Sequence, residues 1–218
     1  MISETYNMDC MEYMRQFPDK HFELAVVDPP YGIDAASDVR GDTKYGKAAT
    51  KSKSYGKKDW DNYKPNLEYF QELRRVSKNQ IIWGANHFLG WKSSCWIVWD
   101  KDNSGDFADC ELAYTSFSTA VRKFKFRWNG MLQQNMKDKE TRIHPTQKPV
   151  ALYDWIYKNY LPNGGKVLDT HLGSGSNRIA ADKAGNIDFW GYELDKDYYD
   201  AQEKRWADFK KQLNLFRA

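Results

Sequence analysis

The chain has 218 residues, of which 41% are hydrophobic and 29% charged, and its 33 basic and 30 acidic residues give a net charge of +3. These are globular proportions, and no stretch approaches the roughly 20 apolar residues of a membrane span, so a disordered chain and a transmembrane protein are excluded. The first residues lack the basic and apolar segments of a signal peptide, which predicts a cytoplasmic, intracellular protein. Three cysteines without a paired spacing and four scattered histidines predict reduced thiols and no metal site.

Strand-like and helix-like patterns alternate along the chain, which predicts a single α/β domain over residues 1–218. An apolar run at 22–27 predicts a strand that ends at Asp28, because two prolines follow it. Pro65 then opens a predicted helix with an apolar stripe formed by Leu67, Phe70, Leu73 and Val76. Further strands are expected at 80–84, 95–99 and 111–118.

Two segments of this first half carry excess positive charge. Between residues 44 and 58 six lysines occur without any acid, among small and polar residues. This composition predicts a mobile cationic loop, set at 34–64, that either contacts nucleic-acid phosphates or is simply solvated; we favour the first. Its lysines are Lys44, Lys47, Lys51, Lys53, Lys57 and Lys58. Residues 121–128 alternate aromatic and basic, which predicts a half-buried strand that presents Lys123, Lys125 and Arg127 to a DNA backbone.

The second half contains a compact β-α-β unit. A helix that starts after Pro149 precedes a strand at 166–170, a glycine turn at 173–175, a helix at 177–184 and a strand at 187–193. Asp169 stands at the end of the first strand, and Glu193 ends the second strand 20 residues after Gly173. This arrangement predicts a nucleoside-cofactor site rather than a plain turn, and Arg178, at a position where the dinucleotide motif needs glycine, disfavours a nicotinamide cofactor.

Asp28-Pro29-Pro30-Tyr31 is the second motif. An exocyclic amine of a base is a poor nucleophile, because its lone pair is delocalised into the ring. The Asp28 carboxylate and the Pro29 carbonyl, held by two prolines, can accept its two N–H bonds and free that lone pair, while Tyr31 stacks on the base. The alternative is a turn at a sheet edge capped by an aspartate.

The two motifs resemble those of the amino-group DNA methyltransferases that use S-adenosylmethionine. Asp28 to Tyr31 looks like their catalytic motif, and Asp169 to Ser176 like their cofactor motif, with Thr170-His171 in place of Pro-Phe and Ser176 in place of Thr. Residues 7–10, 79–86 and 144–149 resemble three further family segments in the family's order. The catalytic motif comes first, as in the circularly permuted β group.

The resemblance implies a class I, Rossmann-like methyltransferase fold, with a mostly parallel sheet, helices on both faces and a small inserted recognition region at about 100–142. It also implies cofactor contacts from many positions, among them His171 in the aromatic role. These positions are Asp9, Cys10, Asp28, Thr146, Lys148, Asp169, His171, Gly173, Ser174, Gly175, Ser176 and Glu193.

The activity expected from the resemblance is methyl transfer to N6 of adenine in double-stranded DNA, with the target base flipped out of the helix. Asp rather than Ser at the first motif position favours adenine in this family. The catalytic set is Asp28, Pro29, Pro30 and Tyr31. A homodimer is also expected. The alternatives are an N4-cytosine DNA methyltransferase, an RNA or protein amino-group methyltransferase, and a non-enzymatic nucleic-acid-binding module.

Overall fold

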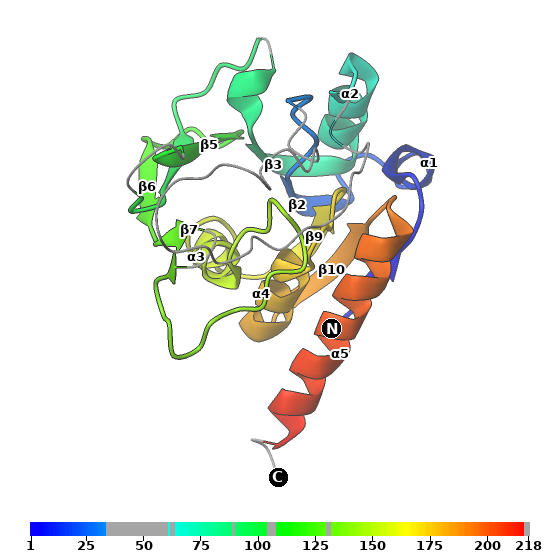
Figure 1. The fold of residues 1–218 in the computed structure, drawn as a ribbon. Coiled ribbons are helices and arrows are strands. Elements are labelled where there is room, and N and C mark those ends of the chain that lie inside the picture. Colours follow the sequence, from blue (N-terminus) through cyan, green and yellow to red (C-terminus); the bar gives the residue numbers. More distant parts are fainter. Residues whose placement is uncertain (34–60, 62–63, 89, 104–107, 130–131, 216–218) are drawn as a thin grey trace.

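The computed structural model describes residues 1–33, 61, 64–88, 90–103, 108–129 and 132–215. These residues form an eight-stranded sheet in the order β1-β10-β9-β2-β3-β5-β4-β6 (Figure 1). Its strands are β1 (Ser3–Tyr6), β2 (Phe22–Val27), β3 (Ser77–Trp83), β4 (Trp96–Asp100), β5 (Cys110–Thr115), β6 (Arg122–Lys125), β9 (Gly165–Asp169) and β10 (Ile187–Tyr192). Only β5 runs antiparallel to its neighbours, so the sheet is mostly parallel, as expected.

Helices cover both faces of this sheet. They are α1 (Cys10–Met14), α2 (Leu67–Val76), α3 (Val150–Tyr160), α4 (Ser176–Ala184) and α5 (Lys196–Leu215). Helices α1 and α2 pack on one face in one apolar cluster, while α3, α4 and aromatic residues of α5 join a second cluster on the other face. In Figure 1 the C-terminal part of α5 extends beyond the sheet. None of the described helices is long and apolar enough to cross a membrane.

The β-α-β unit forms as the sequence predicts. Strand β9 ends at Asp169, α4 is closed by Gly185 in the left-handed conformation, and β10 is followed directly by Glu193. Strand β2 lies beside β9 with Leu24 opposite Val167, so the carboxyl ends of both strands reach the same edge. The Asp28 turn and the glycine turn therefore begin side by side.

Two local predictions need correction. The strand predicted at 121–128 stops at Lys125, because its partner β4 ends at Asp100, where the Phe126 N–H makes the last bond to it. Trp128 pairs instead in the two-stranded ribbon of β7 (Trp128–Asn129) and β8 (Leu132–Gln133). In α2 the predicted apolar stripe omits Tyr69, which is buried, and includes Leu67, which is 70% exposed. Leu67 is the first residue after the Asn66 cap and projects away from the sheet side.

Candidate active site

Asp28 lies at the centre of a buried group of polar side chains. Its Oδ1 accepts a hydrogen bond from the Tyr31 hydroxyl at 2.6 Å, and its Oδ2 pairs with the Lys148 Nζ at 2.5 Å. Burial raises the pKa of Asp28, and the ammonium of Lys148 opposes that rise. The carboxylate is thus held as a hydrogen-bond acceptor in a dry environment, by a lysine that the sequence placed only near the cofactor.

Tyr31 is fixed by backbone and ring contacts that the sequence did not indicate. The Asp61 carboxylate accepts the N–H groups of Tyr31 and Gly32 at 2.7 and 3.0 Å. The His87 ring stacks on Tyr31, with centroids 4.9 Å apart and an interplanar angle of 14°. Gly84, with φ of +64°, passes so close that a Cβ there would lie 2.0 Å from Tyr31 Cε1. The Tyr31 ring is therefore held between Gly84 and His87, two residues that follow β3, and it already stacks on the His87 ring.

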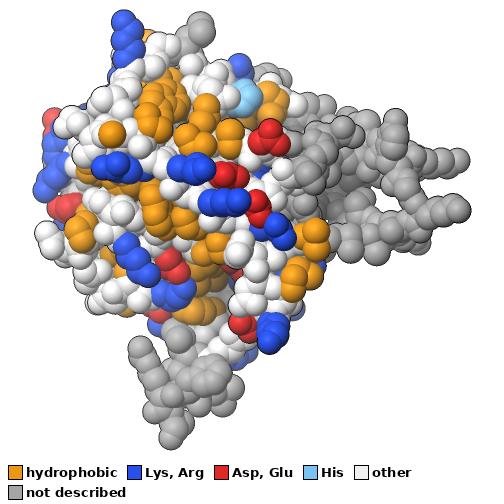
Figure 2. Space-filling view, turned by 90° about the vertical axis from the view of Figure 1, so that its left-hand side faces the viewer, with side chains coloured by type: hydrophobic (Ala, Val, Ile, Leu, Met, Phe, Trp, Pro, Cys, Tyr) orange, Lys and Arg blue, Asp and Glu red, His pale blue; other side chains and the backbone are white. Residues whose placement is uncertain are grey.

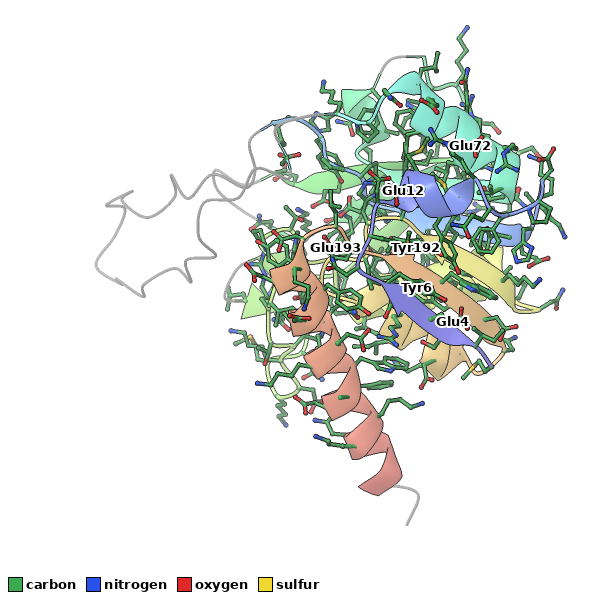
Figure 3. The ribbon with its side chains drawn as sticks, turned by 90° about the vertical axis from the view of Figure 1, so that its right-hand side faces the viewer. Glu4, Tyr6, Glu12, Glu72, Tyr192 and Glu193 are labelled. Atoms are coloured by element: carbon green, nitrogen blue, oxygen red, sulfur yellow. The ribbon has the colours of Figure 1, made fainter. Side chains whose placement is uncertain are left out.

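The glycine turn carries buried acids on its two sides. The Glu193 carboxylate accepts the N–H groups of Gly173 at 2.8 Å and Asp195 at 2.9 Å. Asp169 accepts the His171 N–H at 3.1 Å, and burial raises its pKa to about 7 although the Asn177 amide opposes this. Figure 3 shows Glu193 where β10 turns toward the start of α5. Because each carboxylate oxygen has two lone-pair sites, acceptor capacity remains for a ligand's hydroxyl or ammonium groups.

One side chain connects the two turns. Asn177, in the first turn of α4, donates to the Val26 carbonyl on β2 at 3.2 Å and to Asp169 Oδ2 at 2.9 Å. The Tyr157 hydroxyl in turn donates to the Asn177 carbonyl oxygen. The structure thus brings the predicted catalytic turn and the predicted cofactor turn to one edge of the sheet.

His171 fills the place of the aromatic residue beside the glycine turn. Its ring meets the Tyr69 ring edge-on at 5.5 Å, and Thr170 Oγ1 lies 2.9 Å from its Nδ1. Burial lowers the pKa of His171 to about 4, so the ring is neutral at pH 7 and behaves as an aromatic plate.

The other predicted cofactor residues are distributed around the same edge. Asp9 caps α1 by accepting the Met11 N–H at 2.6 Å, and burial raises the pKa of the adjacent Cys10 thiol to about 12, so Cys10 is no nucleophile. Thr146 Oγ1 lies 3.1 Å from the His144 ring. Ser174 and Ser176 bond each other at 3.1 Å. Arg205 of α5, which the sequence did not single out, donates to the Ser174 carbonyl at 2.8 Å and to Ser176 Oγ at 2.9 Å.

The basic residues predicted to contact DNA divide into two groups. The six lysines between 44 and 58 lie outside the described residues. Lys123, Lys125 and Arg127 are exposed as predicted, but each pairs with an acid: Lys123 with Asp100 at 3.5 Å, and the other two with Asp102 at 2.7 and 2.5 Å. Figure 2 shows basic and acidic side chains close together on this side of the molecule. These three basic side chains are therefore partly neutralised by two acids and do not form a free positive face.

The neutral His171 predicts a pH dependence of folding. A histidine whose pKa is lowered in the folded state costs stability as the pH falls from its unfolded value of about 6.5, because only the unfolded chain takes up the proton. Asp169, with its raised pKa, acts in the opposite direction, so the comparison must be between variants. We expect the melting temperature of His171→Phe to fall less than that of the parent between pH 6.5 and 4. Equal slopes in calorimetric scans would contradict this assignment.

A hollow among the described residues lies elsewhere, between the ends of α3 and α4. Its volume is about 340 Å³, and Asp154, Lys158 and Lys183 are among its lining residues. It carries neither motif. The concentration of buried carboxylates, rather than the size of a cavity, marks the sheet edge as the site.

An α/β sheet that carries these two turns at one edge defines a class of protein, the Rossmann-like methyltransferase domain. A family model described as DNA methylase matches residues 91–204, which is more than half of the chain. The chain belongs to this family of N6 and N4 DNA methylases.

Curated relatives agree with this assignment. The chain is 25% identical to the Type II methyltransferase M.HinfI of Haemophilus influenzae, over 94% of this chain and 68% of that protein. It is 23% identical to the Type II methyltransferase M2.DpnII of Streptococcus pneumoniae, over 90% and 87% of the two chains.

Solved structures confirm the fold. The crystal structure of the M1.HpyAVI–SAM complex matches with a TM-score of 0.59 and 21% identity, covering 94% of this chain and all of that one. The PvuII DNA methyltransferase, described as cytosine-N4-specific, matches with a TM-score of 0.57 and 12% identity over 98% and 93%. The fold is thus shared with a structure described as a complex with SAM and with one described as a cytosine-N4-specific enzyme.

Proposed function

We propose that this DNA methylase transfers a methyl group from S-adenosylmethionine to N6 of adenine in double-stranded DNA. The observation that carries the proposal is the Asp28 carboxylate, which is 18% exposed, ion-paired with Lys148 beside Tyr31, and directly after β2, the strand next to the glycine-turn strand β9. The catalytic turn precedes the cofactor turn along the chain, which supports the circularly permuted β group.

The residues around the glycine turn fit such a cofactor. S-adenosylmethionine carries ribose hydroxyls and two positive groups. The surroundings of the turn offer Glu193 and Asp169 as acceptors with His171 as an aromatic surface, and the start of α1 offers Asp9. Positive φ at Gly173 and Gly175 lets the backbone approach a ligand closely. When bound, the cofactor supplies a methyl group activated by a positive sulfur, and the carbon–sulfur bond breaks with its electrons going to sulfur.

The protein's part is to prepare and orient the nitrogen. Asp28 and the Pro29 carbonyl are proposed to accept the two amine N–H bonds, so that the lone pair points to the methyl carbon. Asp28 needs no strong basicity, since the methylated nitrogen is cationic and readily gives up its proton to the carboxylate or to water. Much of the rate should come from positioning.

The target base must leave the DNA stack to reach Asp28, which costs a few kcal/mol. Tyr31 is proposed to stack on the extruded base in place of the His87 ring that covers it in the free protein. The lysines of the 44–58 segment are proposed to contact phosphates. Because Lys123, Lys125 and Arg127 are paired with acids, their part in binding requires exchange of Asp100 and Asp102 for phosphates. The homodimer expected from the resemblance is tested by the mass of the protein in solution.

The function is tested by offering the protein a labelled methyl donor with DNA, RNA or protein as acceptor. We expect label in DNA, and digestion to nucleosides should give N6-methyladenine. N4-methylcytosine alone would overturn the base assignment, and label confined to RNA or protein would overturn the substrate. Methylation-sensitive sequencing of the same DNA reports the sequence context.

Glu193 provides a separate test of the cofactor site. Glu193→Ala removes acceptors for the ribose and releases the Gly173 N–H. We expect calorimetry to give a dissociation constant for S-adenosylmethionine that is at least tenfold larger, since a lost charged hydrogen bond costs about 1.5–3 kcal/mol. Glu68→Ala, an exposed residue of α2 that pairs with the exposed Arg15, is the control. Unchanged binding by Glu193→Ala would remove this residue from the site.

A further inference from the structure

Lys148 is shared by two carboxylates that come from different strands. Its side chain is only 2% exposed, and its Nζ lies 2.5 Å from Asp28 Oδ2 and 3.1 Å from Glu111 Oε2. Glu111 also pairs with Lys101. The result is a row of alternating charges, Asp28–Lys148–Glu111–Lys101, which we call the ion-pair chain.

The topology explains why Glu111 reaches the active edge. Strand β5 is antiparallel to β3 and β4, so its first residues enter the sheet at the edge where the parallel strands end. Glu111 stands opposite Trp99 near the end of β4, and Lys101 follows that strand directly. No local sequence pattern indicates this meeting.

Glu111 and Lys148 are each stabilised in the charged form by their neighbours. Burial alone would raise the pKa of Glu111, but Lys148 and Lys101 lower it to about 2. Burial alone would lower the pKa of Lys148, but the two carboxylates raise it. A buried ion left without its partner costs several kcal/mol, so removal of one member leaves the others uncompensated.

We propose that Glu111 is a positioning residue that acts through Lys148, by holding the lysine when Asp28 Oδ2 turns from the ammonium to the target amine. This inference rests on the proposed function. In the free protein both oxygens of Asp28 are engaged, by Tyr31 and by Lys148, so an incoming amine that binds Oδ2 competes with the ammonium of Lys148 for this oxygen. Glu111 gives Lys148 a second anionic partner at hydrogen-bond distance, so the displacement leaves no unpaired buried charge.

Lys148 and Glu111 then have opposite effects on Asp28. Lys148 favours the ionised carboxylate, which accepts the amine N–H, whereas the negative charge of Glu111 disfavours it. The other titratable residues near Asp28, Lys148 or Glu111 are left unsubstituted in all the variants described below. They are Tyr31, Tyr69, Tyr153, Asp169, His144 and Lys101.

The experiment compares Lys148→Met, Lys148→Arg and Glu111→Gln, with kcat/KM measured from pH 5 to 9. Activity needs ionised Asp28, so the rate rises with pH through the pKa of that group. Lys148→Met should move the rising limb at least about one unit to higher pH, and Lys148→Arg should restore it. Glu111→Gln should move the limb to lower pH and still reduce the plateau of kcat/KM about tenfold, because the lysine then stays on Asp28.

A readout independent of activity is the carboxyl ¹³C resonance of Asp28, assigned with Asp28→Asn. The midpoint of its titration should move to higher pH in Lys148→Met and to lower pH in Glu111→Gln. Lys183→Met and Glu68→Gln break the exposed pairs Lys183–Asp154 and Arg15–Glu68 and should match the parent.

The outcomes separate the two proposals. If the parent protein methylates no substrate, the proposed function is wrong. The ¹³C titration then still tests the ion-pair chain. If the parent is active but the variants show the same pH profile of kcat/KM and the same titration of the Asp28 ¹³C resonance as the parent, the role of Glu111 is overturned. If Lys148→Met does not fold, Glu111→Gln decides by itself: a downward shift with a reduced plateau supports the proposal, and any other profile overturns it.

Discussion

Asp28→Ala is expected to abolish methyl transfer while cofactor affinity stays near that of the parent. The substitution removes the acceptor for the amine and leaves Lys148 paired with Glu111, so the fold keeps a partner for the buried ammonium. Loss of a positioned acid–base group typically costs 100- to 10,000-fold in rate. Label transfer into DNA measures the first effect and calorimetry with the cofactor the second.

The matched control is Asp19→Ala, which removes an exposed aspartate whose partner Arg75 has other acceptors. It should leave transfer and binding unchanged. Full activity of Asp28→Ala would refute the catalytic assignment. Loss of cofactor binding together with transfer would instead place Asp28 mainly in the cofactor site.

Gly84→Ala should inactivate the protein through Tyr31. The new methyl group would lie 2.0 Å from Tyr31 Cε1 and 2.2 Å from Cζ, so the ring must leave its position between Gly84 and His87. Its hydroxyl would then lose Asp28 Oδ1. We expect a loss of kcat/KM of at least about 100-fold, the scale found for misplaced catalytic groups.

Gly185→Ala separates this effect from backbone strain. Gly185 has φ of +77°, close to the +64° of Gly84, but a Cβ there meets nothing within 4 Å. Both variants should therefore lose roughly 1–2 kcal/mol of stability from the left-handed conformation, whereas only Gly84→Ala should lose activity in the folded state. Equal activity of the two variants, at a temperature where both are folded, would contradict the role assigned to the Tyr31 contact.

The sequence predicted those parts of the molecule that depend on local pattern. The strand at 22–27 stops at the prolines as expected, and Asp169, the glycine turn and Glu193 stand in the predicted order around α4. Periodicity and turn chemistry decide these features within a few residues. That is why two motifs far apart in the chain could be assigned to one site.

Features that depend on strand order could not be predicted in the same way. Glu111 appears in the sequence as one acid in an ordinary strand, and only the antiparallel entry of β5 brings it to Lys148. Asp61 likewise has no pattern around it, yet its carboxylate holds the backbone of residues 31 and 32. The basic face at 123–127 was predicted correctly as exposed, but its acidic partners lie on the neighbouring chain segment at 100–102.

Asn177 has a consequence for how the protein responds to heat. It donates hydrogen bonds both to a β2 carbonyl and to the carboxylate at the end of β9, so it links the Asp28 turn and the glycine turn through the two central strands that precede them. The relative position of the two turns is then kept as long as the central strands stay together. Thermal inactivation should accordingly coincide with cooperative melting of the whole domain instead of preceding it.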